Sequence, residues 1–289
     1  MDVLIFSKDR AFQLYSALET LIQYTEGINN IYVQFSHSKK EFLDGYKKIN
    51  KYFSNVTFID ENEYGFNDTL LTILHQEIST ENLFLEVDDN LYFDKLNLLE
   101  LEKKFNESNA SKLGVGFDIN LFDTKYYTIK NNIAIVDKSI TIDNKIQDIC
   151  LKYPFNVSGA IHRLEDLKKL LTVEKVINPI DLEIKGSSSY IFSNYPYNLY
   201  NIKEVCRQIH TNNFGKRYEE VFDVETLNNF LINGEVLDLS STKLGEYTPD
   251  MRWFNGENIG RFPIFPWEIP PSYHPEIINN RKKINDFSQ

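Results

Sequence analysis

The chain has 289 residues, of which 42% are hydrophobic and 25% charged, the composition of an ordinary globular protein with a sizeable core. Its formal net charge of −11 argues against a protein that holds nucleic acid with a basic face. No segment approaches the ~18 consecutive apolar residues of a membrane-spanning helix, and the N-terminus lacks a signal-peptide pattern. We therefore expect a cytoplasmic protein with no nucleic-acid partner and at most peripheral contact with the inner face of the membrane.

Cysteine usage agrees with this location. Cys150 and Cys206 lie far apart in the sequence and are not spaced like metal ligands. Two isolated cysteines are typical of thiols in a reducing compartment.

Strand and helix patterns alternate through the first part of the chain. Strands are expected at 2–6, 30–36, 56–60 and 83–87, and helices at 11–24, 42–53 and 67–77. This alternation predicts an α/β fold with a mostly parallel sheet and helices on both faces. Right-handed crossovers would place the carboxyl ends of these strands on one edge, where open α/β sheets bind ligands.

The order is less regular further along the chain. Helices are expected at 96–108, 164–171 and 218–231, and strands within 113–122 and 133–142. From residue 247 onward, aromatic side chains stand among prolines and glycines, which predicts an irregular C-terminal extension that wraps over the same body. Its aromatic residues are Trp253, Phe254, Phe262, Phe265 and Trp267.

Three carboxylates stand at the end of the strand at 83–87: Glu86, Asp88 and Asp89. Strand alternation puts Glu86 and Asp88 on one side of the sheet. Carboxylates this close repel, and one takes up a proton unless a cation lies between them. Mg²⁺ or Mn²⁺ would suit these oxygen ligands and would attract a nucleoside diphosphate as a leaving group. The alternative is a solvated acidic turn, since Asp-Asp-Asn also favours turns.

The carboxylate cluster and four further motifs, in order along the chain, resemble glycosyltransferases of the GT-A fold. A cluster of the D-x-D type closes the fourth strand. The opening VLIFSKDRAFQLYSALETL resembles the first strand and helix of family-two-like enzymes, with an S-x-D-R-x-x-Q-L pattern. The runs YPFNVSGAIHRLEDL and INPIDLE, with the segment beginning NIKEVCRQIH, resemble a bacterial and viral subgroup that builds surface glycans. The resemblance covers roughly residues 2 to 240.

This resemblance implies a domain organisation. Residues 1–215 would form the catalytic domain, with 1–90 binding the nucleotide and 91–215 the acceptor. Residues 216–289 would add a helix and the aromatic tail, packed on the same body.

The resemblance also implies residues that bind the donor, a sugar linked to UDP. The loop after the first strand would touch the nucleotide through Ser7, Asp9 and Arg10, with Arg10 on a phosphate or the base and Asp9 on the uracil or ribose. Gln13 would face solvent. The resemblance further assigns Mn²⁺ or Mg²⁺ to Asp88 and Asp89 and the ribose to an earlier acidic residue such as Glu86, although which of the three carboxylates bind the metal stays open.

Other candidates come from their positions in the chain. Asp60 and Glu61 end the third strand on the same edge and would contact ribose or base, or form another acidic turn. His162 would touch the donor sugar or diphosphate, or serve a structural role. His210, with Arg207 and Lys216, would bind metal or clamp the diphosphate.

An inverting transfer needs a general base for the acceptor hydroxyl. Glu183 in NPIDLE is the first choice and Asp181 the second, whereas Glu165 and Asp166 are expected in the exposed first turn of a helix. The predicted function is a metal-dependent glycosyltransferase of the hexosyltransferase type that acts on a glycan or lipid-linked acceptor in polysaccharide or lipopolysaccharide assembly. The alternative is a non-catalytic sugar-nucleotide or carbohydrate-binding module. A nucleotidyltransferase is disfavoured, because SKDRAFQ has no glycine to cradle phosphates.

Overall fold

The structure of the chain, a computed structural model, describes residues 1–115, 119, 122–141, 151–209, 222–240, 242, 244–246 and 273–284. The aromatic residues expected in the C-terminal extension and Cys150 lie outside these ranges. Of the two cysteines, Cys206 is buried as a free thiol. Among the described residues, no helix has both the length and the apolar character needed to cross a membrane.

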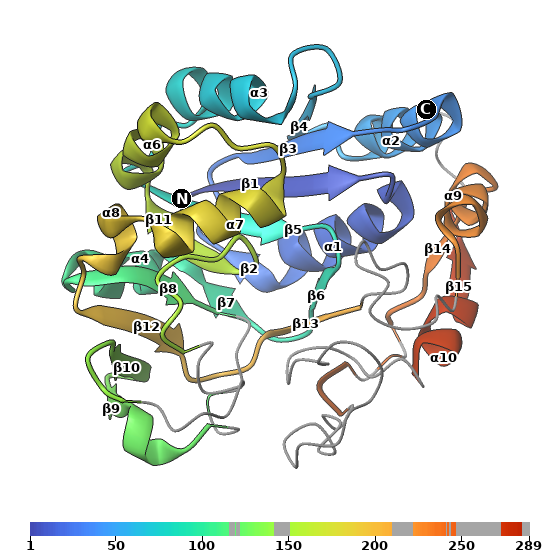
Figure 1. Cartoon of the computed structure of the whole chain (residues 1–289). Coiled ribbons are helices and arrows are strands. Elements are labelled where there is room, and N and C mark those ends of the chain that lie inside the picture. The colour runs from blue at the N-terminus through green and yellow to red at the C-terminus, as the bar shows by residue number, and fades with distance from the viewer. Residues whose placement is uncertain are drawn as a thin grey trace.

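A nine-stranded sheet with the order β4-β3-β1-β5-β11-β8-β12-β10-β9 forms the centre of the protein (Figure 1). Its strands, in chain order, are β1 (Asp2–Lys8), β3 (Ile31–Ser36), β4 (Val56–Asp60), β5 (Asn82–Val87), β8 (Ala110–Gly114), β9 (Thr128–Lys130), β10 (Ile133–Asp137), β11 (Ala160–Arg163) and β12 (Tyr197–Asn201). The strands β4, β3, β1 and β5 run parallel to one another. β11 is antiparallel to both β5 and β8, so β8 shares the direction of the first four strands, and β12 is parallel to β8. The predicted α/β fold with a mostly parallel sheet is confirmed.

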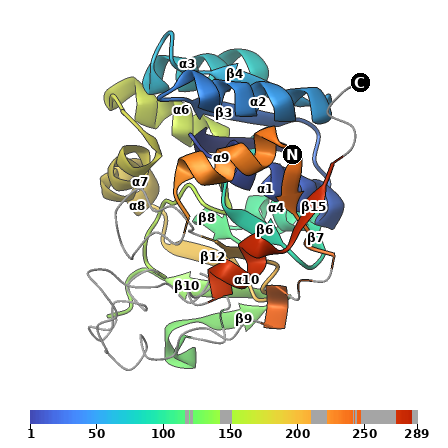
Figure 2. The same cartoon turned by 90° about the vertical axis from the view of Figure 1, so that its right-hand side faces the viewer.

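Helices cover both faces of the sheet. One face carries α1 (Ala11–Tyr24), α2 (Lys40–Tyr52), α4 (Leu98–Asn106) and α9 (Val224–Ile232). The other carries α3 (Phe66–Thr72) with a π-helical turn (Ile73–Glu77), α6 (Leu164–Val173), α7 (Pro179–Ser188) and α8 (Tyr190–Ser193). In Figure 2, α6, α7 and α8 lie toward the left of the sheet, and α1 and α4 toward the right.

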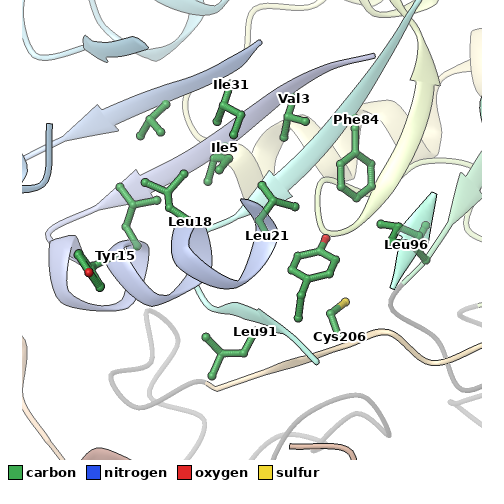
Figure 3. Packing of buried hydrophobic residues seen from close by; sticks show 14 of the residues in the cluster. Val3, Ile5, Tyr15, Leu18, Leu21, Ile31, Phe84, Leu91, Leu96 and Cys206 are labelled. Carbon is green, nitrogen blue, oxygen red and sulfur yellow. The ribbon is translucent and has the colours of Figure 1, made fainter. Parts of the chain in front are cut away.

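The sequence of β1 explains why both faces are covered. Successive side chains of a strand point to opposite faces, and a continuous apolar run therefore needs a cover on each. Val3 and Ile5 pack in the cluster under α1, whereas Leu4 and Phe6 pack in the cluster under α3 and α6. The face under α1 is shown in Figure 3.

The helix α1 follows the predicted period. Leu14, Leu18 and Leu21 recur at helical spacing, and no glycine or proline interrupts the segment. Ten of its residues are buried, because the sheet covers one side and α9 packs against another. Gln13, expected at the surface, is only 3% exposed for the same reason.

Short pairings complete the described structure. They join β2 (Thr25–Glu26) to β7 (Leu96–Asn97), β6 (Asn90–Tyr92) to β13 (Cys206–Gln208), and β14 (Glu235–Leu237) to β15 (Arg281–Lys283). Two 3₁₀ turns (Thr124–Tyr126 and Leu244–Glu246) and α10 (His274–Asn279) are the remaining elements. Buried residues of α9, β14 and α10 belong to the same hydrophobic cluster as α1, so the described C-terminal segments pack on the central body.

Candidate functional site

The carboxyl ends of four parallel strands meet at one edge of the sheet, as the alternation predicts (Figure 1). Near the end of β1, Phe6 stands opposite Gln34 of β3 and Val87 of β5, and Phe35 of β3 stands opposite Asp60 of β4. This register gathers the polar residues that follow the strands. They are Asp9, Arg10, Glu61, Asp88 and Asp89.

The cation between the paired carboxylates is an arginine. Arg10 Nη1 lies 3.2 Å from Asp88 Oδ1 and 3.1 Å from Asp89 Oδ2. The three side chains are 12%, 5% and 3% exposed, so solvent screens the cluster little. Burial lowers the pKa of Arg10, but the charges of Asp88 and Asp89 outweigh burial and leave that pKa raised. The guanidinium therefore stays charged and holds the ends of β1 and β5 together.

Two hydroxyl groups orient Asp88 from the side. Ser7 Oγ donates to Asp88 Oδ2 at 2.8 Å and lies 2.7 Å from the hydroxyl of Tyr46. Because the Ser7 proton goes to Asp88, Tyr46 donates to Ser7, and Tyr46 accepts the backbone N–H of Arg10 at 3.1 Å. Burial raises the pKa of Tyr46, which keeps its hydroxyl protonated. The sequence pattern predicts no site role for Tyr46, because the residue occupies one apolar position on the buried face of α2.

The donor set of Asp88 and Asp89 fits a hard divalent ion. Two carboxylates and one guanidinium leave one negative charge, and burial raises the pKa of Asp88 to about 6 although Arg10 lowers it. Mg²⁺ usually takes one or two carboxylates and completes its shell with waters and phosphate oxygens. The described residues contain no group of three or more acidic, His or Cys side chains that could hold a metal. Two carboxylates match the number of protein ligands that Mg²⁺ commonly takes.

Glu86 is as buried as the two aspartates, with 1% exposure against 3% for Asp88 and 2% for Asp89. It stands opposite Ile5, which packs in the cluster under α1, so it lies on that side of the sheet. One carboxylate oxygen accepts from the backbone N–H of Val87 at 2.9 Å and from the amide of Asn90, and the other accepts from the hydroxyl of Tyr92. Burial raises the pKa of Glu86 to about 7. Because protein donors already occupy both carboxylate oxygens, a structural role for Glu86 is favoured over contact with a ribose.

The candidate residues at the end of β4, Asp60 and Glu61, form hydrogen bonds to β3 and to the loop that follows β3. His37 Nε2 lies 3.1 Å from Asp60 Oδ2, and the backbone N–H of Asn62 donates to Asp60 Oδ1 at 2.9 Å. Gln34 Nε2 donates to Glu61 Oε2 at 2.7 Å. Asp60 and Glu61 remain partly exposed, so the structure leaves both at the predicted edge.

Asp9 makes the turn that brings Arg10 to the carboxylates. Its φ of 57° lies in the left-handed region, where aspartate is among the few side chains that occur with any frequency. Its Oδ1 accepts from the backbone N–H of Ser38 at 2.7 Å, which ties the turn to the end of β3. Asp9 therefore lies beside the cluster and shapes the loop that carries Arg10.

The predicted bases lie on α7, on the opposite face of the sheet from α1. Asn178 caps this helix by accepting the backbone N–H of Asp181 at 2.8 Å, and a proline follows at the first helical position. Asp181 Oδ2 lies 3.0 Å from Lys185 Nζ, so its charge is partnered within the helix. Glu183 is half-buried, and its Oε2 accepts from the backbone N–H of Val157 at 3.3 Å.

A hydrogen-bonded group connects the carboxylate turn with the loop that contacts Glu183. Asn90 Nδ2 donates to Ser158 Oγ at 3.1 Å, and Gln208 Nε2 donates to the same oxygen at 2.5 Å. Ser158 directly follows Val157 in the chain. This group is not predictable from sequence patterns, because its members come from three distant segments.

His162 lies away from this edge. It stands opposite Leu83, at the start of β5, with 0% exposure. Its Nε2 is 2.8 Å from the carbonyl oxygen of Asn156, and its ring is 4.3 Å from that of Phe155. Burial lowers the pKa of His162 to about 3, so the ring is neutral. These surroundings favour the structural role.

The remaining candidates divide between described and undescribed parts of the chain. Asp166, expected to be exposed, is 5% exposed because the hydroxyl of Tyr195 donates to it at 2.6 Å, whereas Glu165 is at the surface. Arg207 forms two contacts of 2.8 Å with Glu204. His210 and Lys216 lie outside the described residues.

Comparisons with known proteins agree with the sequence patterns. No family model matches the chain. Over 229 residues it is 28% identical to a bifunctional glycosyltransferase, pgtA, of Dictyostelium discoideum; the match covers 68% of this chain but only 29% of that protein.

Solved structures with partly similar arrangements include S. aureus TarS 1–349 in complex with UDP, at 12% identity over 71% of this chain and 60% of that one, with a TM-score of 0.47. Another is the mannosyltransferase PcManGT of Pyrobaculum calidifontis in complex with GDP-Man and Mn²⁺, at 12% identity over 74% and 58%, with a TM-score of 0.48. The sequence match to pgtA confirms the predicted resemblance to glycosyltransferases.

Proposed function

We propose that the chain is a glycosyltransferase that moves a hexose from a UDP-linked donor to a glycan or lipid-linked acceptor, with Mn²⁺ or Mg²⁺ bound. The observation that carries this proposal is the buried cluster of Arg10, Asp88 and Asp89 at the carboxyl ends of parallel strands. That edge is where open α/β sheets bind nucleotides. The likeness to pgtA supports the same reaction class.

The cluster would receive the diphosphate. Asp88 and Asp89 would hold the ion, which when bound would supply positive charge to stabilise the departing diphosphate. Arg10 has a fixed charge and a planar fork that suits phosphate, and it already lies between the two carboxylates. Ser7 and Tyr46 keep Asp88 in one orientation, so the site needs little rearrangement when the donor binds.

The nucleoside would extend along the edge toward β3 and β4. Asp60 and Glu61 lie there with oxygen atoms that can accept from ribose hydroxyls or from the base. Asp9 adds a third carboxylate at the turn after β1. The positions of these acceptors support a donor with a ribose and a base that carries N–H groups, as uracil does.

Glu183 is the proposed base for inversion. It is half-buried and accepts a hydrogen bond from the backbone N–H of Val157, in the loop that also contacts the carboxylate turn. Asp181 is the less suitable of the two carboxylates, because it already pairs with Lys185 and accepts a hydrogen bond from the backbone N–H of Ile177, just before the helix. In this role Glu183 takes the proton of the acceptor hydroxyl as that oxygen attacks the sugar.

A thermal-shift screen tests the proposal. UDP, GDP and their common sugar conjugates are added with Mn²⁺ or with a chelator. We expect UDP with Mn²⁺ to raise the melting temperature of the wild type, and Asp89→Asn to lose the part of the rise that needs Mn²⁺. If no nucleoside diphosphate shifts the melting temperature under either condition, the proposal is rejected.

A further inference from the structure

Ser158 is linked through neighbouring residues to both parts of the proposed active site. Its neighbour Val157 donates its backbone N–H to Glu183, and its own Oγ accepts from Asn90, which follows Asp89 in the chain. We propose that the Ser158 hydroxyl donates a hydrogen bond to an oxygen of the donor sugar and helps to select that sugar. This inference rests on the proposed function and assigns a sugar contact within that site.

The geometry leaves the hydroxyl hydrogen of Ser158 available. A serine hydroxyl has one hydrogen to donate and two lone pairs to accept. The side-chain amides of Asn90 and Gln208 donate to the two lone pairs, at 3.1 and 2.5 Å. Within the described part of the chain, the hydroxyl donates to no protein acceptor. Its hydrogen therefore points away from both amides.

Both amides are held firmly. Asn90 and Gln208 stand opposite each other in the β6–β13 pair, and they are 2% and 7% exposed. The amide of Asn90 also donates to Glu86, which fixes which end of the amide faces Ser158. The following residue, Gly159, has a φ of 61°, a left-handed turn that suits glycine and leaves Ser158 half-buried. Ser158 is thus an oriented donor on a rigid frame.

The position favours the sugar over the diphosphate. In the proposed function the diphosphate lies at Asp88 and Asp89, and the base Glu183 acts on the far side of the sugar. Ser158 is hydrogen-bonded to Asn90, beside Asp89, and is joined through Val157 to Glu183, so we expect its hydroxyl to meet the sugar that would lie between these groups. A neutral hydroxyl suits a neutral sugar oxygen, whereas sites for phosphate generally use cations or backbone N–H groups.

Binding experiments on Ser158→Ala test this assignment. Isothermal titration in the presence of Mn²⁺ compares UDP with UDP-glucose, UDP-galactose and UDP-N-acetylglucosamine on the full chain. Loss of one neutral hydrogen bond weakens binding about three- to tenfold. We expect that loss for the conjugate with the tightest wild-type binding, with the affinity for UDP unchanged.

Two further variants keep the test decisive. Ser158→Thr retains the hydroxyl and should retain the ratio of UDP-sugar to UDP affinity. Ser187→Ala removes a hydroxyl on α7 that donates to the carbonyl of Phe155 at 2.9 Å, and it should leave both affinities unchanged. Equal weakening of UDP and UDP-sugar by Ser158→Ala, or no weakening at all, overturns the sugar contact. Failure of the wild type to bind any of these nucleotides instead overturns the proposed function.

Discussion

Arg10 Nη1 lies 3.1 Å from Asp89 Oδ2 and makes a second contact of 3.2 Å with Asp88, so one guanidinium offsets part of the charge of the two carboxylates that the family resemblance assigns to a metal. In the proposed function, the arginine and a divalent ion would share one set of oxygens. An ion bound at Asp88 or Asp89 would weaken the electrostatic attraction that holds Arg10 there. Arg10 would then be available for the diphosphate.

The Arg10→Gln variant measures two effects of Arg10 separately: its competition with a divalent ion and its contribution to stability. Without nucleotide, Arg10→Gln should bind Mn²⁺ about tenfold more tightly, because a competing positive charge is gone. In the presence of a chelator, Arg10→Gln should lower the free energy of unfolding by about 3 kcal/mol, since two buried carboxylates lose their positively charged partner. Titration calorimetry and denaturant unfolding measure the two changes.

The matched control for Arg10 is an exposed ion pair. Lys39 Nζ lies 2.6 Å from Glu225 Oε1, with both side chains more than half exposed. Lys39→Gln should change neither Mn²⁺ affinity nor stability measurably, because solvent screens such pairs. Unchanged or weaker Mn²⁺ binding by Arg10→Gln would contradict the shared-oxygen arrangement.

Tyr46→Phe tests whether the hydroxyl pair beside Asp88 serves ligand binding. The variant removes the hydroxyl that holds Ser7 and the backbone of Arg10, and it should cost about 1 kcal/mol of stability. Because Asp88 is then less firmly oriented, affinity for UDP with Mn²⁺ should fall. Tyr32→Phe is the control, since its hydroxyl donates to the carbonyl of Glu77 at 3.0 Å. It should show a similar loss of stability with unchanged UDP affinity; equal affinities for both variants would refute the role of Tyr46.

The parts of this site that follow local patterns were predictable, and the long-range contacts were not. The edge position of Asp88 and Asp89 follows from strand-helix alternation and from parallel pairing. In contrast, Asn90 and Gln208 meet only because β6 pairs with β13, a pairing between short strands far apart in the sequence. Ser158 joins them from a third segment. No periodicity in one window encodes such a group.

Two further features differ from the sequence-based expectations for similar reasons: the strand β11 and the burial of Asp166. The strand β11 has four residues and precedes α6 directly, so its apolar pattern merges with that of the helix. Asp166 looked solvated because the acidic first turn of a helix usually is. Its burial depends on Tyr195, a residue beyond α8 that the period of α6 does not reveal.

His162 should make stability depend on pH. Its pKa is about 3 in the folded protein because of burial, against about 6.5 in an unfolded chain. Below pH 6.5 the unfolded chain therefore takes up a proton that the folded protein does not, and stability is lost as the pH falls. Between pH 7.5 and pH 5 this loss amounts to about 2 kcal/mol for one such group.

Denaturant unfolding at the two pH values measures this contribution. His162→Phe keeps a ring against Phe155 but removes the titrating group, and the pH-dependent loss should shrink by about 2 kcal/mol. His75→Gln replaces an exposed histidine and should leave the loss unchanged. The assignment fails if His162→Phe and the wild type lose equal stability over this range.

The two carboxylates of α7 should differ sharply in catalysis. Glu183→Gln removes the proposed base and should reduce the transfer rate by about 10²-fold or more, with donor affinity retained. Asp181→Asn weakens the pair with Lys185, 3.0 Å away, and the hydrogen bond that Asp181 accepts from the backbone N–H of Ile177. It should cost about 1 kcal/mol of stability with most of the rate preserved. Initial rates with a UDP-sugar donor, beside the anomeric configuration of the product by NMR, measure both effects. Because attack assisted by a base on the far side of the sugar inverts the anomeric centre, a product with the donor's configuration would remove Glu183 from this role, as would a large loss of rate in Asp181→Asn alone.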